Sequence, residues 1–185
     1  MAVRRAFLGV VPPPAVLDAI EQVVDGIASS DDGLRWTTRN QWHATLQFLG
    51  RVNDLDALAE AVRIAVASVG PPVARLGGGG AFPKVRRGSG LWIGFAVGNE
   101  ALAAVATAIG SAIAPLGYPA QDRDLRPHVT LARARRPRDL RSLVDALGDD
   151  EVGPEWSVPE VELVESETLP EGARYTTRAR LPFAG

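Results

Sequence analysis

Two short stretches of the sequence read His-x-Thr-Leu, and together they contain both of its histidines. They lie at residues 43–46 and 128–131. In an extended strand the side chains of residues i and i+2 point to the same face, so each stretch would present one imidazole beside one threonine hydroxyl. The pKa of a histidine is ordinarily close to neutral pH, so a neutral and a charged imidazole can serve as general base and general acid. The repeated motif therefore predicts a site for proton transfer.

The four side chains of this expected site are His43, Thr45, His128 and Thr130. A lone histidine on an apolar strand is more often a buried core residue, and this alternative applies to each motif taken singly. Two copies of the motif around the only two histidines favour the catalytic interpretation, because such a repeat rarely arises by chance.

Helices are predicted where apolar residues recur at three- and four-residue spacing. These segments are residues 14–28, 55–66, 100–113 and 140–147. Asp54 and Asn99 can cap the second and third of them, because their side chains accept hydrogen bonds from free backbone amides. Prolines at positions 12 to 14 open the first helix and stop the strand before it.

Strands are predicted where apolar and β-branched residues run between turn residues. They cover residues 3–11, 34–36, 43–49, 73–76, 91–97, a segment that begins at His128, 156–168 and 174–182. Residues 29–33, 77–80, 133–141 and 170–172 are expected to be loops or turns. The third of these is rich in arginine. The four glycines at 77–80 are interpreted as a turn or bulge, because no nucleotide-binding pattern follows them.

The two halves of the chain repeat one order of elements, in which a strand, a helix, a His-x-Thr strand and a second helix follow one another. Alternating strands and helices also suit a parallel doubly wound sheet. However, prolines occupy the first turn, where that fold has a glycine-rich phosphate loop. We therefore predict an α+β fold with two mostly antiparallel sheets flanking a central cleft. Residues 1–185 would form a single domain with two pseudo-symmetric lobes.

The composition, with 46% hydrophobic and 23% charged residues, is that of an ordinary globular protein. A formal net charge of −2 supplies no global attraction to nucleic acid or to a membrane surface, so an anionic ligand must be held locally. Lys84 is the only lysine among the twenty basic residues, and arginine can pair bidentately with phosphate. For most of these arginines a GC-rich genome is the better explanation.

The chain has no cysteine, which excludes disulfides, a thiol nucleophile and a zinc-thiolate site and fits a cytoplasmic location. Two histidines without neighbouring carboxylates make a poor metal site, so neither a metal nor a cofactor is expected. The apolar run in residues 1–11 is too short for a signal peptide. We identify no run of about eighteen apolar residues that would span a membrane. We expect a monomer with no membrane partner.

With both motifs located, nearly the whole chain resembles the two-histidine (2H) phosphoesterase superfamily, and within it the RNA 2′,3′-cyclic phosphodiesterases formerly described as 2′-5′ RNA ligases. The similar segments are 5–7 with the prolines after them, 35–50, 82–83 before 91–92, 122–133 and 172–175. Two departures are Ala44, where the family usually has a bulkier residue, and the long glycine run. Neither changes a motif position.

The resemblance implies metal-independent hydrolysis of an RNA or nucleotide 2′,3′-cyclic phosphodiester to a 2′-phosphomonoester. His43 would be the proton donor to the leaving 3′ oxygen and His128 the proton acceptor that activates water. Thr45, Thr130 and Arg133 would bind the phosphate, so both imidazoles should lie within reach of one phosphate although 85 positions separate them.

Arg133 needs a further condition, because an offset of five residues from His128 turns a side chain to the opposite face of a regular strand. A bulge, or a long side chain that reaches round the strand end, would bring it to the phosphate. The alternative is a surface salt bridge.

Two other functions remain open at this stage. One is a non-catalytic module that binds a nucleotide or RNA end. The other is the same site acting on 2′-5′ oligonucleotides, on ADP-ribose 1″,2″-cyclic phosphate or in 2′-5′ RNA joining. Phe7, Trp36 and Trp42 could stack on a base, although aromatic residues of this kind more often pack in the core.

Overall fold

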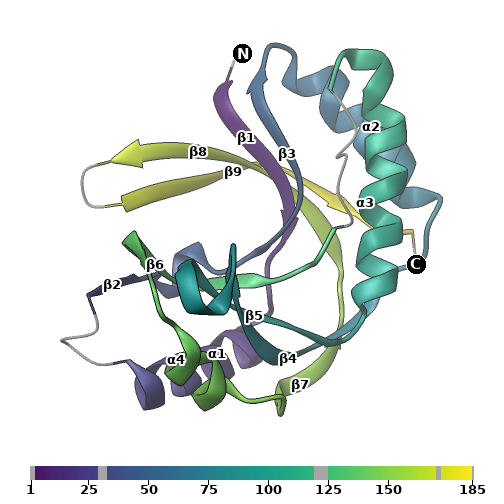
Figure 1. Cartoon of the computed structure of the whole chain (residues 1–185). Coiled ribbons are helices and arrows are strands. Elements are labelled where there is room, and N and C mark those ends of the chain that lie inside the picture. Colours follow the sequence, from purple (N-terminus) through teal and green to yellow (C-terminus); the bar gives the residue numbers. More distant parts are fainter. Residues whose placement is uncertain (1–2, 29–32, 119–124, 170–171, 185) are drawn as a thin grey trace.

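The alternating segments of the chain form nine strands that join in one curled antiparallel sheet within the residues that the structure describes, which are 3–28, 33–118, 125–169 and 172–184. Figure 1 shows this computed structural model. The strands are β1 Val3–Val10, β2 Leu34–Trp36, β3 Ala44–Val52, β4 Val73–Phe82, β5 Gly88–Val97, β6 Val129–Arg138, β7 Glu151–Ser157, β8 Glu160–Leu169 and β9 Gly172–Pro182. Their order is β7-β4-β5-β6-β3-β1-β8-β9, with β2 paired to β6.

The sheet consists of two groups of strands that meet at a single residue pair. We name them the β1 half (β3, β1, β8 and β9) and the β5 half (β7, β4, β5, β6 and β2). Strands β3 and β6 are joined only through Ala44 and Val129, each directly after a motif histidine. The predicted α+β class with antiparallel strands is therefore confirmed. The two predicted sheets are continuous through this one bridge.

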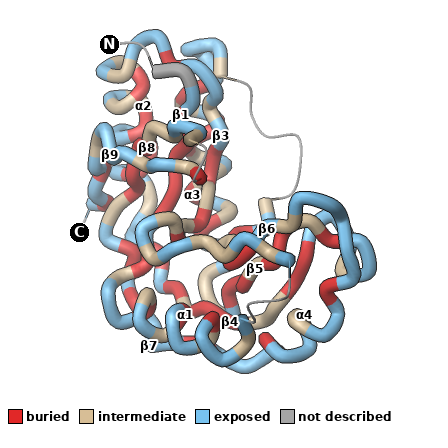
Figure 2. The backbone as a smooth tube through the Cα atoms, turned by 90° about the vertical axis from the view of Figure 1, so that its left-hand side faces the viewer, coloured by how far each residue is buried: buried red, intermediate tan, exposed pale blue. Residues whose placement is uncertain are grey.

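Helices pack against each half of the sheet, and the buried residues lie mainly on the strands and on the helices packed against them (Figure 2). The helices are α1 Pro14–Ile27, α2 Leu55–Ala67, α3 Asn99–Ile113 and α4 Arg141–Leu147, with short 3-10 turns η1 Arg39–Gln41, η2 Val85–Arg87 and η3 Ala114–Leu116. Helices α2 and α3 pack on the β1 half, whereas α1 and α4 pack on the β5 half. Each half-sheet thus takes one helix from each half of the chain, which ties the halves together.

The expected glycine loop is wrong, because residues 77–80 lie inside strand β4. At Gly79 and Gly80 a neighbouring side chain excludes a Cβ atom. A Cβ atom at Gly80 would lie 2.1 Å from the Trp92 ring, and one at Gly79 would lie 2.6 Å from Leu147. The register shift between Leu76 and Gly79 shows that the bulge alternative was correct.

Three further expectations need correction. The arginine-rich segment after residue 133 continues β6 to Arg138 instead of turning, because it pairs with β5 and β2. The predicted strand 156–168 is divided between the end of β7 and β8, and residues 151–155 of β7 were not predicted, since Gly153 and Pro154 are poor strand formers. Asn99 is the first residue of α3, and Gly98 caps the helix with a φ of 97°.

Other element predictions lie partly or wholly outside the described residues, namely the loop at 29–33 and the turn at 170–172. Asp54 caps α2 as predicted, since its carboxylate accepts hydrogen bonds from the amides of Asp56 and Ala57.

Residues Asn99–Leu116, which comprise α3 and η3, are long and apolar enough to cross a membrane by length and composition, with a mean hydropathy of 1.3. This corrects the expectation that no such segment exists. Leu102, Val105 and Ile109 form a buried stripe on α3, and Thr107 and Ser111 on another face are exposed. That pattern is typical of a helix packed on a sheet.

Candidate active site

The two motif strands are held together by the indole of Trp42 and the hydroxyl of Thr37. The Trp42 indole N–H donates to the Thr37 hydroxyl at 3.0 Å. That hydroxyl in turn lies 2.8 Å from the backbone carbonyls of Thr130 and Leu131, which share its single proton. Because Trp42 precedes His43, this chain of hydrogen bonds fixes the first motif against the second.

A bulge in β6 solves the problem of the Arg133 offset. Trp92 pairs with Thr130, but the preceding residue of β5, Leu91, pairs with Ala132, so Leu131 is an extra residue. Leu131 and Ala132 are both fully buried. The extra residue restores Arg133 to the face that carries His128 and Thr130.

The first motif has the same irregularity. Leu8 pairs with Gln47 and Gly9 with Thr45, so Leu46 is the extra residue in β3. Leu46 and Gln47 are both buried, and Phe48 returns to the face of Thr45. Phe48 is therefore the counterpart of Arg133, five residues after its own histidine.

All five predicted site residues line one cavity of about 1070 Å³ between the two half-sheets. They are His43, Thr45, His128, Thr130 and Arg133. Arg5 and Arg126 also line it. None of the described residues around this cavity is an aspartate or glutamate, so its charged groups are cationic and complement a phosphate.

Both imidazoles are fixed in the same tautomer by backbone carbonyls. The Nδ1–H of His43 donates to the Gln41 carbonyl at 2.7 Å, and the Nδ1–H of His128 donates to the Arg126 carbonyl at 2.8 Å. A carbonyl can only accept, so Nδ1 carries a proton in each ring. This leaves Nε2 of each histidine as the nitrogen that can exchange a proton with a ligand.

Each histidine packs against two aromatic rings. His43 stacks on Phe7 at 4.4 Å and meets the edge of Tyr175 at 5.0 Å. The ring centre of His128 lies 5.0 Å from that of Phe82 and 5.8 Å from that of Trp92. The rings restrain both imidazoles and exclude water from one side of each.

Burial lowers the pKa of His43 from 6.5 to about 4, against the Gln41 hydrogen bond that raises it. Charge repulsion from the protonated form of His128 and from Arg133 lowers the pKa of His43 further. The pKa of His128 is lowered too, first by burial and then by Arg133, while its bond to the Arg126 carbonyl raises it. Both histidines are therefore mainly neutral at pH 7 before a substrate binds.

The most exposed of the described aromatic residues that line the cavity is one that sequence reasoning did not propose for base stacking. Phe48 is 71% exposed and lines the cavity. Phe7 and Trp42 are each only 4% exposed, and Trp36 is half-buried against the core. The offset from His43, equal to that of Arg133 from His128, is the signal that would have found Phe48.

The hairpin that carries Tyr175 was predicted from its strand and turn pattern, but only family resemblance singled out the segment of Tyr175. Burial raises the pKa of Tyr175, whereas the positive charges of Arg133, Arg5 and Arg35 lower it. Strands β1, β2, β6 and β9 thus bring together residues that are far apart in the sequence. No local pattern marks these residues as parts of one site.

The family model of the 2′-5′ RNA ligase superfamily matches residues 12–169. The chain belongs to this superfamily, which confirms the resemblance drawn from the motifs. A similar relative is the RNA 2′,3′-cyclic phosphodiesterase of Methanothermobacter thermautotrophicus, 30% identical over 93% of this chain and 95% of that protein. The enzyme of the same name from Aeropyrum pernix is 30% identical over 83% of this chain and 88% of that protein.

The fold is also that of a solved structure, protein TT0787 of Thermus thermophilus. The two share 25% sequence identity with a TM-score of 0.83, and the match covers 98% of each chain. The elements that surround the cavity therefore belong to a fold already seen by experiment.

Proposed function

We propose that the protein hydrolyses RNA and nucleoside 2′,3′-cyclic phosphodiesters to 2′-phosphomonoesters without a metal. The observation that carries this proposal is the pair of His-x-Thr motifs facing one cationic cavity, with Nδ1 of each histidine occupied by a carbonyl. The names of the relatives support the same reaction for this chain.

In the proposed step water attacks phosphorus as the bond from phosphorus to the 3′ oxygen breaks. Nε2 of His128 takes the proton from water, and Nε2 of His43 gives its proton to the departing 3′ oxygen. The hydroxyls of Thr45 and Thr130 donate to the non-bridging oxygens, and Arg133 balances their charge. The cyclic diester is strained, so positioning, proton transfer and charge stabilisation suffice.

The assignment of His43 as acid and His128 as base rests on family resemblance. The low pKa of His43 opposes this assignment until a substrate binds. The pKa of His43, at about 4, disfavours the charged form that an acid needs. A phosphodiester anion in the cavity acts in the opposite direction, because a nearby negative charge raises the pKa of both histidines. Substrate binding is therefore expected to proceed with uptake of a proton.

Turnover of 2′,3′-cyclic AMP tests the proposal against a binding module of the same fold. The expected result is release of 2′-AMP and no 3′-AMP. Binding of the cyclic nucleotide without any hydrolysis would favour the binding module instead.

Chelation of metals is expected to leave turnover unchanged. The described residues contain no cluster of three or more histidines and carboxylates that could hold a metal, and the cavity supplies two histidines without a carboxylate. The measurement is the rate on 2′,3′-cyclic AMP before and after dialysis against EDTA, with a metal-dependent phosphodiesterase as the control for complete chelation. A loss that added Mn²⁺ or Mg²⁺ restores would contradict metal independence.

Phe48 is proposed as the platform for the base of the terminal nucleotide, because an exposed ring at a polar cavity offers a stacking surface. Stacking on an aromatic residue contributes about 1–3 kcal/mol per base. Phe48→Ala is therefore expected to raise KM at least fivefold, with little change in kcat, and Phe48→Trp to preserve KM. The control is Ile64→Ala, which also removes an exposed apolar side chain but lies on α2, outside the cavity lining. Equal KM values for Phe48→Ala and wild type would exclude the stacking role.

A further inference from the structure

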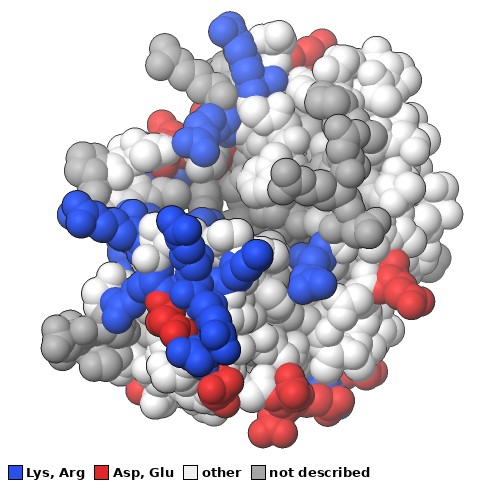
Figure 3. Space-filling model, viewed as in Figure 1, with Lys and Arg blue, Asp and Glu red and all other residues white. Residues whose placement is uncertain are grey.

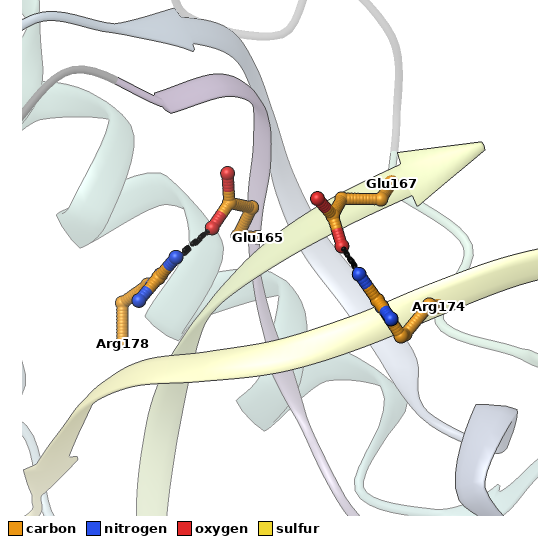
Figure 4. Close-up of polar contacts among 4 residues, drawn as sticks. All are labelled: Glu165, Glu167, Arg174 and Arg178. Carbon is orange, nitrogen blue, oxygen red and sulfur yellow. Dashed lines mark hydrogen bonds and ion pairs between the residues drawn. The ribbon is translucent and has the colours of Figure 1, made fainter. Parts of the chain in front are cut away.

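Two groups of basic side chains in the described part of the chain differ in whether a carboxylate neutralises them. One group forms ion pairs with carboxylates: Arg39, Arg63, Arg75, Arg141, Arg174, Arg178 and Arg180. Figure 4 shows two such pairs across β8 and β9, Glu165 with Arg178 and Glu167 with Arg174. Their charges are largely neutralised within the protein.

The second group lies on η2 and on the outer half of β6. Its members are exposed and form no ion pair with a carboxylate of the described residues: Lys84, Arg86, Arg87, Arg135, Arg136 and Arg138. We name this set the η2–β6 cationic surface. Figure 3 shows basic side chains gathered over this part of the molecule. Asp139 lies beside the surface, but its carboxylate is held by Arg141, whose hydrogen bonds lower the pKa of Asp139 to about 2.

Backbone geometry explains why so many of these side chains reach solvent. On β5, Gly88 and Gly90 are two positions apart, but their partners on β6, Arg138 and Arg133, are five positions apart. The intervening segment of β6 must bulge away from β5. Arg135 and Arg136, which would point to opposite faces of a regular strand, are therefore both exposed.

The η2–β6 cationic surface is continuous with the cavity through a single strand. Arg133 lines the cavity, and Arg135 follows it by about 7 Å along the strand. From Arg133 to Arg138 the strand extends for at most about 17 Å, which equals the rise of about five stacked nucleotides. Charges of one sign thus begin at the phosphate site and continue outward along β6.

We propose that the η2–β6 cationic surface binds the backbone phosphates of the RNA whose cyclic phosphate end occupies the cavity. This inference rests on the proposed function. A 2′,3′-cyclic phosphate terminates its strand, so the remaining chain leaves the cavity in the 5′ direction and must cross the rim. On the β6 side the rim carries arginines with no carboxylate partner among the described residues. On the β8–β9 side Arg174 and Arg178 are paired with carboxylates, and Arg5 hydrogen-bonds to Thr168. Arginine forks match phosphate oxygens, which favours the β6 side as the path of the RNA.

The test compares a single nucleotide with a longer substrate. Arg135→Gln/Arg136→Gln removes two charges from the surface, and Arg63→Gln/Arg180→Gln removes two exposed charges from α2 and β9, away from the cavity. For each protein kcat/KM is measured on 2′,3′-cyclic AMP and on a ten-nucleotide RNA with a 2′,3′-cyclic end, between 50 and 300 mM salt.

The surface variant is expected to retain wild-type kcat/KM on 2′,3′-cyclic AMP and to lose about tenfold on the RNA at low salt. Its slope of log kcat/KM against log salt, which is negative, should become less steep by about 1.4, because each lost contact to single-stranded RNA removes about 0.7. The control variant should match wild type on both substrates. Equal losses on both substrates, or no loss on the RNA, would overturn the proposal.

A separate binding measurement distinguishes failure of this inference from failure of the proposed function. If wild-type protein turns over neither substrate, fluorescence anisotropy with the same labelled RNA replaces the rate. If only the surface variant then binds the RNA more weakly, the proposed RNA-binding role of the η2–β6 cationic surface is supported and the proposed hydrolytic function is rejected. A polyglutamate peptide is also tested as a competitor of the labelled RNA. If it competes as strongly as unlabelled RNA of equal charge, the surface binds an acidic protein, which also overturns the proposal.

Discussion

Replacement of His43 or His128 by alanine is expected to lower kcat on 2′,3′-cyclic AMP at least 10²- to 10³-fold, the range for loss of a general acid or base. Each ring presents its Nε2 toward the reaction because its Nδ1 is bound to a carbonyl. Alanine removes the proton-transfer group and also an aromatic contact. Thermal melting by circular dichroism is therefore measured on each variant to separate lost chemistry from lost packing.

A substrate with a good leaving group separates the two roles, because its departing oxygen needs no proton. An aryl phosphodiester is expected to rescue His43→Ala and leave His128→Ala inactive, since water must still be activated in both cases. Rescue of His128→Ala alone would show that the roles are reversed, as the low pKa of His43 before a substrate binds would suggest. Equal activity of wild type and both variants would remove the histidines from the mechanism.

Arg133→Gln is expected to cost about 10- to 100-fold in kcat/KM, less than loss of a histidine. The guanidinium lines the cavity together with both imidazoles and can stabilise charge on the non-bridging oxygens. Arg5 and Arg126 line the same cavity, so part of its positive charge remains in the variant. Arg133→Lys, which keeps the charge but loses the planar fork, is the matched control and should retain part of the activity.

The same variant is expected to move the pH profile of kcat/KM, which reports the pKa values of the free enzyme. Activity needs one charged and one neutral histidine, and both pKa values lie below 6.5, so the wild-type optimum should fall below pH 6.5. The charge of Arg133 lowers both pKa values, so its removal raises them and shifts the bell-shaped profile to higher pH. Arg133→Lys should leave the profile in place. A shift to lower pH in Arg133→Gln would contradict this electrostatic coupling.

The sequence by itself determined the elements whose signals are local. The spacing of apolar residues defined the four α-helices of the described residues to within a few positions, and Asp54 capped α2 as its side-chain chemistry requires. The antiparallel α+β class also followed from the order of elements and from prolines in the first turn. The motifs pointed to His43 and His128 because an i, i+2 pair on a strand needs no knowledge of distant residues.

Only the tertiary structure decided where the strands are irregular and what surrounds the histidines. The bulges at Leu46 and Leu131 depend on the register with β1 and β5, and they bring Phe48 and Arg133 to the cavity. The glycines of β4 read as a loop from composition, but they make room for Trp92 and for Leu147 of α4. Strand register, burial and pKa are set by neighbours that are remote in the chain, so no local pattern of residues can encode them alone.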